Sequence, residues 1–256
     1  MNPEEQARVQ IDQLLQYAGW EVQDRARMSL FGRPGRGVAL REAVMTTGEA
    51  DYLLLVDGRA LGVIEAIRAG HTLSHVEEQS GRYAVGLPPG IKPWLPDRPL
   101  PFRYESTGVE TYFTNDLDPA PRSRPIFAFH RPATLAAWAD EPQTLRARLR
   151  QMPPLITDAL WPPQIEAIRN LEVSLAQDRP RALIQMATGS GKTFTAVNFV
   201  YRLIRHADAR RVLFLVDRNN LGKQAYAEFT NLITPDDGRK FEDLYNINHL
   251  AGNTID

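Results

Sequence analysis

The alternation of apolar and polar residues predicts a first part of the chain rich in short strands. Residues 4–18 place their apolar side chains on one face at helical spacing, and Gly19 follows as a stop signal, so an amphipathic helix is expected there. Short runs rich in β-branched and aromatic residues then predict strands at 20–23, 38–44, 51–56, 60–67, 102–107, 110–114 and 126–129. Short helical segments at 134–139 and 144–150 end this part.

In the second part, helices alternate with short apolar segments. A helix is expected to begin at Trp161, with prolines in its first turn. The stretch 182–187 opens apolar and short, as a buried strand would, and 211–216 is a continuous apolar run. The two predict parallel strands joined by the helix 194–204. We therefore predict an α/β protein with two domains, a mixed-sheet domain at 1–150 and a parallel-sheet domain at 151–256.

Composition excludes several classes of protein. The formal net charge of the 256 residues is −1, so any nucleic acid must meet a local basic patch rather than an overall positive field. The chain has no cysteine, which excludes disulfides and cysteine-ligated metals and fits a reducing compartment. Because no apolar run is long enough to cross a bilayer and no signal segment is evident, we expect a cytoplasmic protein with no membrane segment.

The segment between the first predicted strand and helix of the second part has the chemistry of a phosphate-binding loop. Glycines in this context let backbone N–H groups surround a phosphate at the positive end of the helix dipole. Lys192 is expected to reach the β- and γ-phosphates of ATP, and the Thr193 hydroxyl to bind Mg²⁺. The cofactor-binding residues we predict here are Thr188, Gly189, Ser190, Gly191, Lys192 and Thr193. The alternative is a glycine-rich helix start with an exposed lysine.

Two carboxylates interrupt the apolar strands of the first part. Asp51 begins one strand, Glu65 lies in the next, and Asp57-Gly58 between them is a strong hairpin signal. Burying both acids without partners would be costly, so we expect them to be paired or to bind a metal such as Mg²⁺. A shared metal requires Asp51 opposite Glu65, and this needs a three-residue loop or one bulge. The alternative is that both are ordinary acids of a hairpin.

A carboxylate followed on the next strand by Glu-x-Lys resembles the layout of PD-(D/E)xK nucleases, in which the acids hold Mg²⁺ and the lysine helps the attacking water. Here the lysine position holds Ile67, and Ala66 and Arg68 alternate to the other face. The sequence therefore predicts poor cutting, and Ile67→Lys is expected to raise it by a factor on the order of a hundred to a thousand.

Taken together, the motifs resemble the N-terminal part of the R (restriction and motor) subunit of type I restriction-modification enzymes over essentially the whole chain. The motifs that carry this resemblance are Gly48-Glu-Ala-Asp51 with Val63-Ile-Glu-Ala66, Gln79-x-x-x-Tyr83, Leu183-Ile-Gln-Met-Ala-Thr-Gly-Ser-Gly-Lys-Thr193 and Phe214-Leu-Val-Asp-Arg-Asn-Asn-Leu221. The resemblance implies a PD-(D/E)xK nuclease-like domain followed by the first part of a RecA-like helicase or translocase domain.

The same resemblance implies ATP-dependent translocation of double-stranded DNA coupled to Mg²⁺-dependent cleavage, in a complex with methyltransferase (M) and specificity (S) subunits. It assigns catalytic roles to Asp51, Glu65, Gln79 and Tyr83, the metal to Asp51, Glu65 and Thr193, and adenine recognition to Gln164. Because the acidic motif of the motor and its second domain are not found, a partial R subunit is expected. The alternatives are a non-catalytic DNA- or nucleotide-binding remnant and a small P-loop kinase fused to a binding domain.

Overall fold

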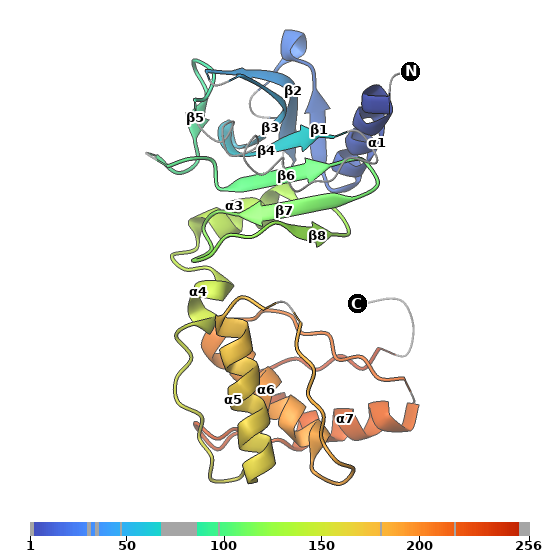
Figure 1. Ribbon diagram of the computed structural model, residues 1–256, viewed down its shortest axis with the longest axis vertical. Helices are drawn as coiled ribbons and strands as arrows, with labels where there is room; N and C mark the ends of the chain where they lie inside the picture. Colours follow the sequence, from blue (N-terminus) through green and yellow to red (C-terminus); the bar gives the residue numbers. More distant parts are fainter. Residues whose placement is uncertain are drawn as a thin grey trace. The chain divides into compact units, whose positions relative to one another are not determined.

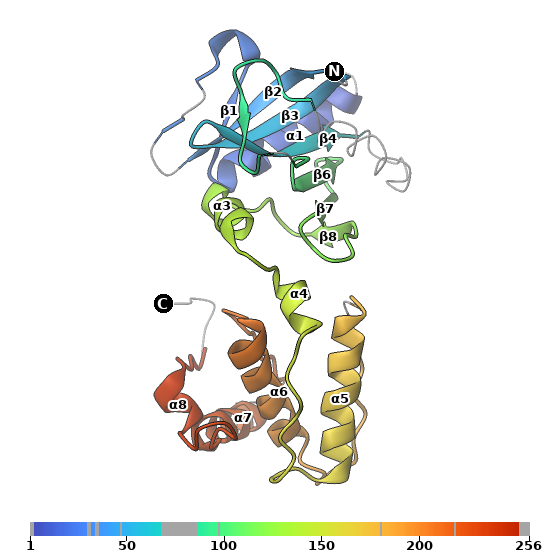
Figure 2. The same ribbon diagram turned by 90° about the vertical axis from the view of Figure 1, so that its left-hand side faces the viewer.

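The computed structural model describes residues 3–29, 32–33, 36–46, 48–67, 86–96, 98–179, 181–217 and 219–250. The chain divides into two compact units, Met1–Thr144 and Leu145–Asp256 (Figures 1 and 2). Gln79 and Tyr83, to which the resemblance assigns catalytic roles, lie outside the described residues.

The first unit is built on an eight-stranded mixed sheet with the order β1-β2-β3-β4-β6-β7-β8, and β5 pairs separately with β4. Its strands are β1 (Trp20–Gln23), β2 (Gly37–Met45), β3 (Gly48–Val56), β4 (Arg59–Ala66), β5 (Lys92–Pro93), β6 (Phe102–Ser106), β7 (Thr111–Asn115) and β8 (Arg124–Ile126). The pairs β1–β2, β4–β5 and β4–β6 are parallel, and the others are antiparallel. The predicted mixed sheet is thus confirmed.

Apolar side chains fill both faces of this sheet. On one face, α1 (Pro3–Tyr17) and α3 (Pro132–Asp140) pack through residues such as Ile11, Leu15 and Leu135 onto alternate strand positions such as Tyr52 and Ile64. The other face forms a second buried cluster, to which Ile91 and Leu100 contribute from the proline-rich segment. A short 3-10 turn, η1 (Arg25–Arg27), follows β1. The predicted first helix and its stop at Gly19, with φ +93°, are confirmed.

His130 lies half-buried among aromatic rings of the first unit. The Tyr104 hydroxyl is 2.8 Å from its Nδ1, and the rings of Phe113 and Trp138 pack around it at centroid distances of 4.5 and 4.8 Å. Burial lowers the pKa of His130 from 6.5 to about 4. The imidazole is therefore neutral in the folded protein at pH 7.

This shift predicts an acid-sensitive first unit. Below pH 6.5 His130 binds a proton in the unfolded state but stays neutral in the folded state. The free energy of unfolding therefore decreases as the pH falls from about 6.5 towards 4. We expect a loss of at most about 2 kcal/mol between pH 7 and pH 5, because partial exposure screens the effect. Urea denaturation at both pH values should show a smaller loss for His130→Gln than for wild type. His249→Gln, an exposed histidine of the other unit, is the control, and an unchanged loss in His130→Gln would contradict the prediction.

The second unit is helical within the residues described. Its helices are α4 (Leu145–Leu149), α5 (Pro162–Ala176), α6 (Lys192–Ala207), α7 (Asn219–Asn231) and α8 (Phe241–Leu244). A core of Val197, Tyr201, Phe229, Leu232 and Phe241 joins α6, α7 and α8. The predicted helices from Trp161 and over 194–204 are confirmed, with α6 continuing three residues further.

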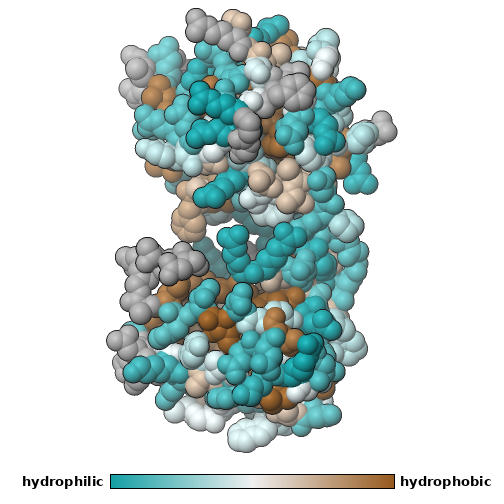
Figure 3. Space-filling model, turned by 180° about the vertical axis from the view of Figure 1, so that it is seen from behind, coloured by the Kyte–Doolittle hydropathy of each residue, from teal (hydrophilic) through white to brown (hydrophobic). Residues whose placement is uncertain are grey.

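The two strands predicted for the second unit are not found. Residues 182–187 and 211–216 run without strand pairing, and the only bridge among the described residues of this unit joins Ile233 and Lys240. Their apolar side chains are open to solvent, with Leu183 93% and Leu215 80% exposed. Figure 3 shows hydrophobic residues in brown on one face of the molecule. A parallel strand is stable only between hydrogen-bonded neighbours with both faces covered, and neither segment has such neighbours here. The predicted parallel sheet is therefore absent from the described structure.

Arginines in and directly after α4 hold the second unit together. Arg146 Nη1 and Arg150 Nη2 donate to the buried carboxylate of Asp178 at 3.2 and 2.6 Å. Arg148 Nε donates to the Ala207 carbonyl at the end of α6, at 2.7 Å. All three side chains are thus bonded within the unit.

In the described part of the chain, no helix combines the length and apolar character needed to span a membrane.

Candidate functional site

The predicted phosphate-binding loop leads directly into α6. Gly189 and Gly191 have φ values of +80° and +78°, in the left-handed region that other residues rarely adopt. Gly191 is the N-cap, and Lys192 and Thr193 are the first two residues of the 16-residue helix. Because the first amides of a helix have no acceptor within it and carry the positive end of its dipole, this junction is suited to an anion.

The side chains of the loop lie close to its own backbone. Lys192 Nζ donates to the Ala187 carbonyl at 3.1 Å, and Ser190 Oγ donates to the same oxygen at 2.7 Å. Lys192 is exposed and Thr193 is partly exposed. A single hydrogen bond to a carbonyl is a weak restraint on an exposed lysine, so Lys192 can turn from Ala187 to a phosphate oxygen.

Gln164 ties the start of α5 to this loop. Its side-chain oxygen accepts from the Trp161 N–H at 3.0 Å, and its Nε2 donates to the Ser190 carbonyl at 3.1 Å. A Cβ on Gly191 would lie 2.3 Å from Gln164 Nε2, so the position accepts only glycine without movement. The residue predicted to recognise adenine is therefore beside the loop, where its amide makes these two hydrogen bonds.

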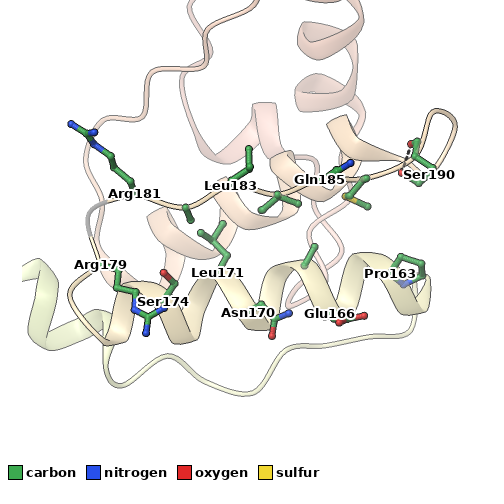
Figure 4. A pocket seen from close by; sticks show the side chains of 15 residues that line it. Pro163, Glu166, Asn170, Leu171, Ser174, Arg179, Arg181, Leu183, Gln185 and Ser190 are labelled. Carbon is green, nitrogen blue, oxygen red and sulfur yellow. Dashed lines mark hydrogen bonds between the residues drawn. The ribbon is translucent and has the colours of Figure 1, made fainter.

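A groove of about 650 Å³ begins at the same loop. Figure 4 shows it between α5, which contributes Pro163, Glu166 and Asn170, and the extended segment 181–187. Ser190 closes one end, and Arg179 and Arg181 stand at the other. Both apolar and polar side chains line the groove. One of its walls is the segment 181–187, most of which was predicted to be a strand.

The two carboxylates of the first unit lie on neighbouring strands in the register that was predicted. Tyr52 pairs with Ile64, which places Asp51 opposite Glu65 one residue further along, and the register shifts between Leu54 and Leu55. The bulge that a shared metal requires is thus confirmed. Alternation alone does not give the face of Asp51, because Ala50 packs in the second cluster with Leu53, whereas Tyr52 packs in the cluster beneath α1.

Both oxygens of Asp51 are hydrogen-bonded. Oδ1 accepts from Nη2 of Arg8 on α1, and Oδ2 accepts from the Ala66 N–H at 2.8 Å. Nη1 of Arg8 also donates to Glu42 at 3.2 Å, where the backbone of β2 takes a left-handed φ of +51°. The side chain of Asp51 is 11% exposed and that of Arg8 34% exposed. Sequence reasoning missed Arg8, because nothing in the spacing relates it to residue 51.

A further acid lies next to Glu65. Glu105 on β6 pairs in register with Glu65, is 1% exposed, and accepts a hydrogen bond from Ser123 at 3.3 Å. Even so, within the ranges that the structure describes, no three or more His, Cys, Asp or Glu side chains converge as a metal site. Mg²⁺ commonly takes only one or two carboxylates and fills its shell with water and phosphate oxygens, so Asp51 and Glu65 alone can suit it.

Comparison with known proteins first identifies the second unit. The family model described as "Type III restriction enzyme, res subunit" (ResIII) matches residues 158–252, which contain the loop, α5, α6 and α7. The second unit therefore carries a ResIII domain, a domain of helicase type.

The relatives that match extend the similarity beyond this unit. It is 28% identical to the type I restriction enzyme EcoKI endonuclease subunit of Escherichia coli (strain K12), over 97% of this chain and 25% of that protein. It is 37% identical to the EcoAI endonuclease subunit of Escherichia coli over 34% of this chain and 11% of that protein. The chain is thus homologous to the endonuclease (R) subunits of type I restriction enzymes, which confirms the resemblance of its motifs.

The chain spans about a quarter of the length of the EcoKI subunit and about a tenth of the EcoAI subunit. A solved fragment described as an HsdR subunit of a type I restriction enzyme from Vibrio vulnificus YJ016 is also similar. It shares 21% identity, with a TM-score of 0.39, over 79% of this chain and 38% of that one.

Proposed function

We propose that the second unit binds Mg-ATP and belongs to a motor that moves double-stranded DNA. The observation that carries this proposal is the glycine loop at the start of α6, with Lys192 and Thr193 in the first turn. The loop amides and Lys192 take the phosphates, and the Thr193 hydroxyl takes Mg²⁺. Gln164, bonded to the loop at Ser190, is near enough to join the base to the phosphate site.

Thr193→Ala tests the metal part of this proposal. The variant should bind Mg-ATP about tenfold more weakly, since it loses one oxygen ligand worth about 1–2 kcal/mol, while its affinity for ATP in EDTA stays unchanged. Calorimetry with and without Mg²⁺ separates the two affinities. Thr230→Ala, the same chemical change on α7, is the matched control. An equal loss with and without Mg²⁺ would assign Thr193 to the fold of the loop instead.

For the first unit, we propose a Mg²⁺-dependent nuclease of the PD-(D/E)xK kind, which cuts DNA in a complex with M and S subunits. The observation that favours it is the bulge that sets Asp51 opposite Glu65. These two carboxylates would hold the ion, which polarises a phosphodiester and activates water when bound. Gln79 and Tyr83 are proposed to assist at the same site.

Asp51→Asn tests this second function through metal binding. The change removes a charge but keeps the shape, so Mn²⁺ affinity should fall at least tenfold by calorimetry. Asp57→Asn in the same hairpin is the control, because asparagine tolerates its left-handed φ of +48° and residue 57 is not a proposed ligand. Equal Mn²⁺ affinity for Asp51→Asn and Asp57→Asn would refute the metal site.

A further inference from the structure

A cation already contacts the candidate nuclease site, although the strand position that should supply one holds Ile67. The guanidinium of Arg8 on α1 is hydrogen-bonded to Oδ1 of Asp51. The other oxygen of the same carboxylate accepts from Ala66, the residue directly before Ile67. The Asp51 carboxylate is thus hydrogen-bonded both to the guanidinium of Arg8 and to the backbone next to the lysine position.

Arg8 also has a second carboxylate partner. Glu42 accepts a hydrogen bond from its Nη1 at 3.2 Å. With a third of its side chain exposed, the guanidinium remains within reach of a ligand in solvent. A guanidinium is planar, permanently charged and can contact a carboxylate and a phosphate at the same time, which an isoleucine cannot do.

We propose that Arg8 supplies the positive charge of the nuclease site in place of a lysine at 67. This inference rests on the proposed nuclease function. In the hydrolysis, the oxygen of water bonds to phosphorus, one P–O ester bond breaks, and the water protons pass to the leaving alkoxide and to solvent. Arg8 keeps its own proton throughout and stabilises the charge that develops on the phosphate. The structure thereby changes the expectation for Ile67→Lys, because the missing charge is provided from α1.

The test uses two measurements on the protein assembled with the proposed M and S partners. Nicking of supercoiled plasmid reports cutting, and calorimetry with Mn²⁺ reports metal affinity. Arg8→Ala should cut about a hundredfold more slowly, while its Mn²⁺ affinity stays equal or rises, because loss of a positive charge does not weaken cation binding. Arg8→Lys should keep part of the activity. Ile67→Lys should add little to wild type but should restore cutting to the Arg8→Ala protein.

Three results would overturn the proposal. If Arg8→Ala lowers both cutting and Mn²⁺ affinity, Arg8 only holds Asp51 in position. If Arg8→Ala cuts faster, Arg8 competes with the metal. If wild type binds Mn²⁺ but does not cut, Arg8 provides no useful charge. Failure of the nuclease function itself has a different signature, since Asp51→Asn would then leave Mn²⁺ affinity unchanged.

Discussion

Asp178→Ala is expected to destabilise the second unit by about 4 kcal/mol. The carboxylate is 2% exposed and accepts Arg146 and Arg150, which join α4 to the end of α5. Burial raises the pKa of Asp178, but the hydrogen bonds from Arg150 and Arg146 outweigh this and hold the pKa below its usual value. Removing the anion leaves two arginines without their counter-ion, at a cost of about 3 kcal/mol after allowing for their partial exposure. Alanine at the left-handed φ of +58° adds about 1 kcal/mol.

Asp208→Ala separates the charge effect from the backbone effect. Asp208 also has a left-handed φ, +56°, but its side chain is 62% exposed and lies 3.8 Å from Arg148. Its replacement should cost only about 1 kcal/mol. Amide hydrogen exchange in α5 and α6 reads the stability of this unit separately from the other. Equal losses for the two variants would show that the Asp178 ion pairs contribute nothing beyond backbone conformation.

The strands of the first unit could be predicted because each signal was local. Alternation gave the buried face, and Asp57-Gly58 gave the turn of the β3–β4 hairpin. Where the local signals were mixed, the predicted bounds of the strands were wrong. The strand expected at 126–129 is β8 at Arg124–Ile126, and Phe127 is fully exposed. The proline-rich segment 87–101, for which no strand was predicted, contributes β5 and buried side chains such as Ile91.

In the second unit, an apolar run alone did not show whether a segment forms a strand. Residues 182–187 and 211–216 have the composition of buried strands, but a strand also needs partners for its N–H and C=O groups. Those partners come from other segments, and the runs themselves do not specify them. The helices were predictable because their hydrogen bonds are internal. The glycine loop was predictable for a similar reason, since the left-handed turns at Gly189 and Gly191 depend on those residues alone.

Only part of the carboxylate site, Asp51 and Glu65, could be predicted from the sequence. The register of Asp51 and Glu65 was predicted because a shared metal requires it, and a bulge between Leu54 and Leu55 produces it. Arg8, Glu42 and Glu105, however, reach the site from α1, β2 and β6. Such contacts depend on how helix and strands pack, which no spacing in the sequence encodes. The ion pairs of Asp178 could not be predicted for the same reason, because Asp178 lies 28 residues or more from Arg146 and Arg150.

Lys192→Ala is expected to weaken Mg-ATP binding by a factor on the order of a hundred or more. An ammonium group contacting two phosphates makes charge-assisted hydrogen bonds worth about 1.5–3 kcal/mol each, so their loss is not compensated by the loop amides. The fold should not suffer. Lys192 is exposed at the first turn of α6 and makes one hydrogen bond, to the Ala187 carbonyl, that solvent can replace.

Lys223→Ala on α7 is the matched control, since it removes the same charge from another exposed helical position of the same unit. It should bind Mg-ATP like wild type in calorimetry, and all three proteins should unfold at the same urea concentration. Lys192→Arg sharpens the test, because a planar guanidinium keeps the charge but does not fit the narrow loop as a point charge does, so it should recover only part of the affinity. If Lys192→Ala binds Mg-ATP as tightly as Lys223→Ala, the loop at Gly189 and Gly191 is a glycine-rich helix start and the nucleotide must be sought elsewhere in the unit.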